Sequence, residues 1–128
     1  MKKLIFIILA LAIFVPSICQ AKVTLFGTTD QEKIKVAEKF SPFYRDDIKI
    51  QVVPSFPEDP FKMGSTRFYS NGLKDIRVRA GGYDNYDGGY TFEFTVNHEI
   101  CHYNYPSYTE DQCDDLADRM INFVNSLY

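Results

Sequence analysis

The chain is poor in the residues that most often carry out chemistry, and it has no excess of positive charge. Its 128 residues include only two histidines and three cysteines, and 14 lysines and arginines stand against 17 acidic residues. A protein that binds nucleic acid through the phosphates would show a basic face, so we expect no nucleic-acid partner. With so few histidines and cysteines, the positions of these residues carry most of the functional information.

Long apolar runs are also missing, apart from one at the N-terminus. Residues 4–15 form an uninterrupted apolar run that follows two lysines and precedes small and polar residues ending at Ala21. This run is shorter than the roughly 20 residues that a membrane-spanning helix needs, so we expect no stable membrane anchor. The pattern is typical of a secretory signal peptide over residues 1–21, which predicts a secreted or periplasmic protein. The remaining residues, 22–128, are expected to form a single domain.

Hydrophobic periodicity and turn residues predict an α+β domain in which an N-terminal helix and a small β-sheet precede two C-terminal helices. Capping-box patterns mark the starts of the first and last helix, with Thr28 or Thr29 paired with Glu32, and Ser107 with Glu110. The predicted elements are a helix over 29–40, strands within 47–55 and 73–82, loops over 55–72 and 81–90, a helix over 91–105 that ends before Pro106, and a helix from Ser107 onward.

Both histidines lie in the segment TVNHEICHYNY, residues 95–105, and they are four positions apart. On a helix, residues at this spacing project from the same face, so His98 and His102 can present ring nitrogens to one metal ion. Glu99 follows the first histidine, where its carboxylate can take a proton from a metal-bound water and pass it to a leaving amine. The alternative is a solvent-facing helix that carries two histidines by chance.

A catalytic zinc site needs a third protein ligand and keeps one position open for water. The chain has no third histidine, so a carboxylate from a neighbouring element is expected to complete the site. The segment EDQCDDLAD, residues 110–118, supplies several carboxylates directly after the turn at Pro106.

At this point the sequence resembles the gluzincin metallopeptidases, in which a histidine-glutamate-x-x-histidine helix is followed by a second helix with a glutamate ligand. The resemblance covers roughly residues 91–120 and extends to small bacterial members with a minimal zincin core. It implies that Glu110 is the third zinc ligand and that Asp114, one turn further along, supports a histidine from outside the ligand set. The same pattern shifted by one turn makes Asp114 the ligand and Asp118 the support, and this alternative remains open.

The resemblance implies an exported, zinc-dependent metallopeptidase that hydrolyses peptide bonds by metal-activated water. Zinc is then the cofactor, Glu99 the general base, and a peptide or protein the substrate. The alternative is a catalytically silent zinc-binding or interaction module of the cell envelope. The presence of Glu99 favours the enzyme, because a structural metal site has no use for a base at that position.

Of the three cysteines, Cys19 lies in the predicted signal peptide, so Cys101 and Cys113 remain. Two cysteines in an oxidising compartment indicate a disulfide, and the alternative is a pair of buried free thiols. In the chain-entropy model, closing a loop of about a dozen residues contributes on the order of 3 kcal/mol. The bridge would join the two helices that carry His102 and Glu110.

Overall fold

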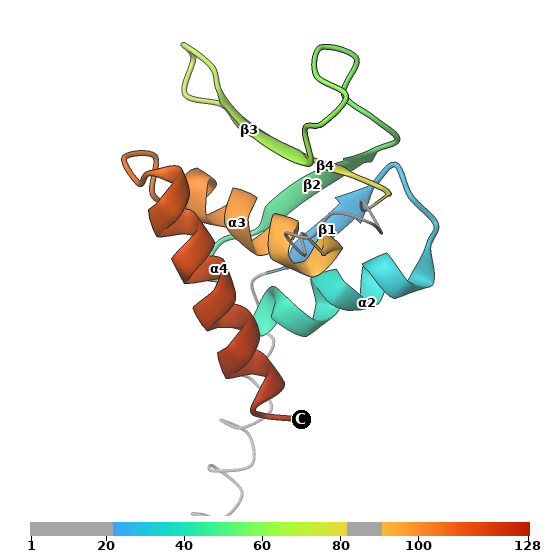
Figure 1. The fold of residues 1–128 in the computed structure, drawn as a ribbon, viewed down its shortest axis with the longest axis vertical. Helices are drawn as coiled ribbons and strands as arrows, with labels where there is room; N and C mark the ends of the chain where they lie inside the picture. Colours follow the sequence, from blue (N-terminus) through green and yellow to red (C-terminus); the bar gives the residue numbers. More distant parts are fainter. Residues whose placement is uncertain (1–21, 82–90) are drawn as a thin grey trace, which may run out of the picture.

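A computed structural model of the chain describes residues 22–81 and 91–128. The predicted signal peptide therefore lies outside the described residues, as does nearly all of the loop predicted over 81–90. The described residues have an α+β fold with one four-stranded sheet and three α-helices (Figure 1). None of these helices combines the length and the apolar character that crossing a membrane requires.

The sheet is mixed, and its strand order is β1-β2-β4-β3. Strands β1, β2 and β4 are parallel, and β3 pairs with β4 in the antiparallel direction at one edge. The strands are β1 (Val23–Phe26), β2 (Ile48–Val53), β3 (Gly64–Phe68) and β4 (Lys74–Arg79).

The sequence-based prediction found β2 and β4 but missed the two edge strands. The predicted loop over 55–72 is wrong in part, because it contains β3. The sequence of this strand, GSTRF, has no alternation of apolar and polar residues that would predict it. None of its residues is fully buried. Strand β1 has only four residues, which is too short to show a clear period.

The apolar residues of β2 and β4 explain why these strands form the centre of the sheet. Ile50 pairs with Ile76, and Val52 with Val78, in the parallel register of the two strands. Ile50, Ile76 and Val78 form one core with Val96 and Ile100 of α3 (Phe92–Asn104), which covers this face of the sheet. Burying each such side chain contributes about 1.5–3 kcal/mol, so this layer holds α3 against the sheet.

The starts of the helices differ from the predicted capping boxes. Helix α2 (Gln31–Phe40) is capped by Asp30, whose carboxylate accepts a hydrogen bond from the Glu32 N–H, so the predicted role of Thr28 or Thr29 is wrong. A charged carboxylate at the N-cap is also favourable beside the positive end of the helix dipole.

Helix α4 (Glu110–Asn125) is capped by Thr109, which forms a capping box with Gln112. The predicted box between Ser107 and Glu110 is therefore wrong. The difference matters for the site, because Gln112 performs the capping and leaves the Glu110 carboxylate free to reach other groups.

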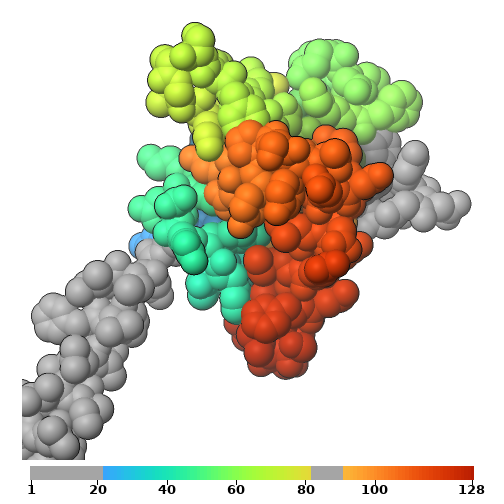
Figure 2. All heavy atoms as spheres, turned by 90° about the vertical axis from the view of Figure 1, so that its left-hand side faces the viewer, coloured from blue at the N-terminus to red at the C-terminus, as the bar shows by residue number. Residues whose placement is uncertain are grey.

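Helix α4 packs antiparallel against α3 after a short turn (Figure 1). Its buried face is formed by Cys113, Ala117 and Val124. The small side chains at the first two of these positions let the two helices approach closely near the turn. Figure 2 shows this end of the hairpin, in orange, directly below the green and yellow-green segments that include the β3–β4 hairpin.

The position of Ile76 in this core yields a test of the fold. Its side chain is only 1% exposed, whereas Leu73, just before the same strand, is 64% exposed. We expect Ile76→Ala to lower the free energy of unfolding by about 2–5 kcal/mol, because the loss of buried methyl groups leaves a cavity. Urea denaturation measures the change, and Leu73→Ala serves as the control with an expected change within about 0.5 kcal/mol. Equal losses in the two variants would contradict this packing.

Candidate metal centre

Three potential metal ligands meet beside the turn that joins α3 and α4. His98 and His102 project from one face of α3, and Glu110 is the first residue of α4. The Nε2 atom of His98 lies 2.9 Å from Glu110 Oε2, and the Nε2 atom of His102 lies 3.0 Å from Glu110 Oε1. The two Nε2 atoms are 3.1 Å apart. One potential ligand atom from each residue therefore lies within 4.8 Å of the others.

The residues present fit a zinc ion. Zinc bound by histidine and carboxylate at 2.0–2.2 Å with tetrahedral geometry separates its ligand atoms by about 3.3 Å, close to the distances in this cluster. The two Nε2 atoms also face each other and the same carboxylate. A cation bound by all three groups suits this arrangement better than a proton on either ring nitrogen does. The side chains of both histidines are mostly buried, but that of Glu110 is 78% exposed, so the cluster opens to solvent on one side.

Asp114 contacts the outer side of the His98 ring. Its Oδ1 atom lies 2.7 Å from Nδ1 of His98, and this nitrogen is buried. The contact is at ion-pair distance but lacks the direction of a hydrogen bond. A carboxylate on the far nitrogen of a histidine fixes the ring orientation and raises the basicity of the nitrogen that faces a metal.

The structure thus brings Glu110, and not Asp114, to the Nε2 atoms of both histidines. Asp118, the support in the shifted alternative, makes no ion pair or hydrogen bond with either histidine in the part of the chain that the structure describes. This arrangement arises because α4 begins at Glu110, which lies level with the histidines, while Asp114 lies one helical turn further along α4.

Glu99 lies beside the cluster and is 7% exposed. Burial raises the pKa of its carboxyl group, while the hydrogen bond from Thr66 and the charges of His98 and His102 oppose the rise. The carboxylate lines a cavity of about 250 Å³ together with His98 and Glu110. A buried carboxylate that shares a cavity with potential metal ligands is the arrangement expected of a general base.

Strand β3 lines this cavity through Gly64. Two residues of the strand, Gly64 and Thr66, contact Glu99, and the sequence-based prediction missed both contacts. The Thr66 hydroxyl lies 2.6 Å from Glu99 Oε2. A side-chain carbon added at Gly64 would lie 2.7 Å from Glu99 Cγ and 2.9 Å from Thr95 Cγ2, so a larger residue there would have to displace these side chains. An isolated glycine within a strand often marks such a close approach, and this was the one signal that the sequence offered.

The two cysteines of the domain lie at disulfide distance across the same helix pair. Cys101 of α3 and Cys113 of α4 have Cα atoms 5.5 Å apart, and both side chains are at most 1% exposed. Cys101 precedes His102, and Cys113 follows Glu110 by three residues. A disulfide at this position would tie together the two helices that carry the cluster, close to the cluster itself.

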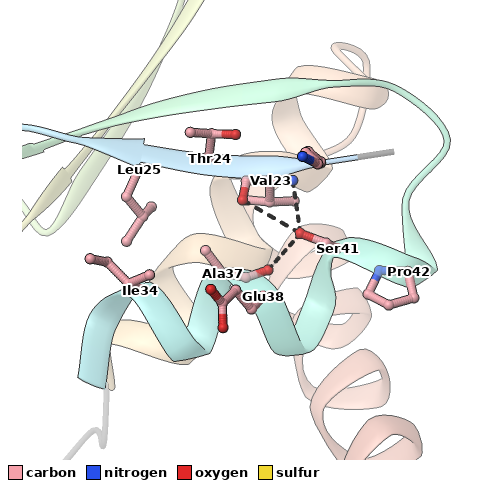
Figure 3. A pocket seen from close by; sticks show the side chains of 9 residues that line it. Val23, Thr24, Leu25, Ile34, Ala37, Glu38, Ser41 and Pro42 are labelled. Atoms are coloured by element: carbon pink, nitrogen blue, oxygen red, sulfur yellow. Dashed lines mark hydrogen bonds between the residues drawn. The ribbon is translucent and has the colours of Figure 1, made fainter. Parts of the chain in front are cut away.

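A second cavity, of about 390 Å³, lies between β1 and α2 (Figure 3). The Ser41 hydroxyl accepts a hydrogen bond from the Val23 N–H there and donates to the main-chain oxygen of Ala37 (Figure 3). None of the potential metal ligands lines this cavity. The smaller cavity beside Glu99 is therefore the candidate site.

Comparison of the chain with protein-family models, with curated proteins and with solved structures found no match. Functional assignment thus depends on the geometry of the site.

The positions of Glu110 and Asp114 predict different effects on metal affinity. Glu110→Ala removes a ligand atom and should reduce the zinc content of the purified protein to near zero. Asp114→Ala removes a contact behind His98 and should weaken binding by roughly 10–100-fold, which chelator competition measures. Asp111→Ala, an exposed neighbour in the same turn, is the control and should bind zinc as the wild type does. A larger loss of zinc affinity in Asp114→Ala than in Glu110→Ala would contradict the assignment of Glu110 as the ligand and Asp114 as the support of His98.

A disulfide between Cys101 and Cys113 predicts that its reduction weakens metal binding as well as the fold. Reduction with a phosphine should lower the free energy of unfolding by on the order of 3 kcal/mol, because the unfolded chain gains the entropy of an open loop. It should also weaken zinc binding, since α4 then holds Glu110 less firmly against α3. Thermal unfolding and chelator competition before and after reduction measure the two effects. Unchanged zinc affinity in the reduced protein would show that the bond does not support the cluster.

Proposed function

We propose that this chain is a zinc-dependent metallopeptidase with a minimal gluzincin core, in which His98, His102 and Glu110 bind the metal. The observation that carries the proposal is the convergence of two Nε2 atoms and one carboxylate at distances of 2.9, 3.0 and 3.1 Å. Three protein ligands leave a fourth position for water or substrate, which distinguishes catalytic zinc sites from closed structural ones.

The arrangement of the domain supports this proposal. The helix with both histidines lies against a small sheet, and a second helix returns along it with the glutamate. This order of elements is compatible with the minimal zincin core that the sequence resemblance implies. An antiparallel edge strand, β3, lies beside the same helix and forms one wall of the cavity.

The chemistry follows from the groups around the cavity. A zinc ion bound by the three ligands would supply a Lewis acid that polarises a substrate carbonyl and lowers the pKa of a water molecule. Glu99 lines the same cavity, where its carboxylate can accept a proton from water and deliver it to the leaving amine. Asp114 holds the His98 ring in place from behind. Met63 and Phe94 give the cavity its apolar lining.

We further propose that the protein acts on peptides or proteins outside the cytoplasm. The N-terminal sequence supports export, and the cysteine pair at disulfide distance is compatible with an oxidising compartment.

Glu99→Gln tests the role of the base. The variant keeps the shape of the side chain and loses its basicity, so we expect unchanged zinc content and a loss of hydrolysis of roughly 10²–10⁴-fold. The substrate is a library of synthetic twelve-residue peptides of mixed sequence, with cleavage read by mass spectrometry. Glu93→Gln, a matched change on the same helix away from the cluster, should cleave as the wild type does.

The outcomes separate the proposal from its alternative. Full cleavage by Glu99→Gln would remove Glu99 from the mechanism. A wild-type protein that binds one zinc ion per chain and cleaves no peptide would instead be a silent zinc-binding module. A protein that binds no zinc would contradict both.

A further inference from the structure

The only hydrogen bond to the Glu99 carboxylate within residues 22–81 and 91–128 comes from the edge strand. Thr66 Oγ1 lies 2.6 Å from Oε2 of Glu99 and 3.0 Å from the main-chain oxygen of the same residue. One hydroxyl thus contacts both the backbone and the side chain of the proposed general base.

Gly64 makes this contact possible. A Cβ atom at this position would lie 2.8 Å from Oε1 of Glu99 and 2.7 Å from its Cγ. Strand β3 therefore touches the glutamate side chain along its length, with Gly64 beside Oε1 and Thr66 bound to Oε2. Gly64 lines the same cavity as His98, Glu99 and Glu110, and Oε1 is the carboxylate oxygen beside Gly64.

We propose that Thr66 is a positioning residue that holds Oε2 of Glu99 and thereby directs Oε1 into the cavity, an inference that rests on the proposed function. A glutamate side chain has three rotatable bonds, and fixing it in one orientation has an entropic cost. The Thr66 hydroxyl offsets this cost with a hydrogen bond to a charged acceptor, the stronger kind in proteins. Without this hydrogen bond, Oε2 would be buried with no partner, which favours a rotation of the carboxylate towards water.

The hydroxyl suits a group that gains and loses a proton. It carries one hydrogen and has two acceptors within reach, the carboxylate and the main-chain oxygen. When Glu99 is charged, the hydroxyl donates to Oε2. When Glu99 carries the proton taken from water on Oε1, Oε2 remains an acceptor for the hydroxyl, so Oε2 keeps a partner in both forms.

Thr66→Val and Thr66→Ser test this role. Valine has nearly the same shape without the hydroxyl, and serine keeps the hydroxyl without the methyl group. We expect Thr66→Val to lower kcat for cleavage of the peptide library by roughly 10–100-fold, since misplacing a reacting group by about 1 Å has such an effect. The KM, the zinc content and the melting temperature should change little, and Thr66→Ser should restore most of the rate. Ser65→Ala, the next residue on the opposite face of β3, is the control.

The effect should depend on Glu99. In a Glu99→Gln background, Thr66→Val should cause no further loss, because residues that act as a unit are not additive. Absence of cleavage by the zinc-loaded wild type would contradict the proposed function itself. An active wild type with an equally active Thr66→Val variant would overturn only the role of Thr66. A Thr66→Val variant that loses zinc together with activity, and that serine does not restore, would make the contact merely structural.

Discussion

The candidate site depends on the antiparallel packing of α4 against α3. Two histidines on one helix face can approach an ion from one side only, so the third ligand has to come from another element. The short turn and the Thr109 cap start α4 at the level of the histidines, and Glu110 is its first residue. Small buried residues and the Cys101–Cys113 pair keep the two helices close at this end. Any change that separates the helices therefore removes the ligand as well as the packing.

The edge strand β3 imposes the second constraint. It has little apolar surface of its own, and it is held by its pairing with β4. Its residues contact α3 at Glu99, where Gly64 and Thr66 enclose the carboxylate. Burial makes the charged form of this carboxylate less favourable, and the hydrogen bond from Thr66 opposes that effect. The sheet thus supports α3 through its apolar centre and controls the proposed base through its polar edge.

The sequence was sufficient for the parts of the molecule that depend on short-range periodicity. The spacing of four between His98 and His102 predicts a shared face, and the apolar alternation of β2 and β4 predicts central strands. The α+β class and the two C-terminal helices follow from the same signals. The helix starts were harder to predict, because several threonines and serines near each start could act as caps.

The contacts of Glu99 could not be predicted in the same way. Thr66 and Glu99 are 33 residues apart in the sequence. The strand that carries Thr66, β3, shows no alternation of apolar and polar residues. Their contact follows from the order of strands in the sheet, which a single sequence does not encode locally. The same holds for the choice between Glu110 and Asp114, since both lie on one helical face and only the turn geometry separates them. The identity of the ligands is thus a tertiary property, although the residue types are visible in the sequence.

The central claim is that two imidazoles and one carboxylate of this chain bind zinc with a position left open. X-ray absorption at the zinc edge of the purified protein tests this most directly, because it reports the number, type and distance of the ligands. The account predicts one zinc ion per chain with nitrogen and oxygen ligands at about 2.0–2.2 Å, two of them imidazoles, and no sulfur. A sulfur ligand at about 2.3 Å, or a protein that holds no zinc after purification without chelators, would contradict it.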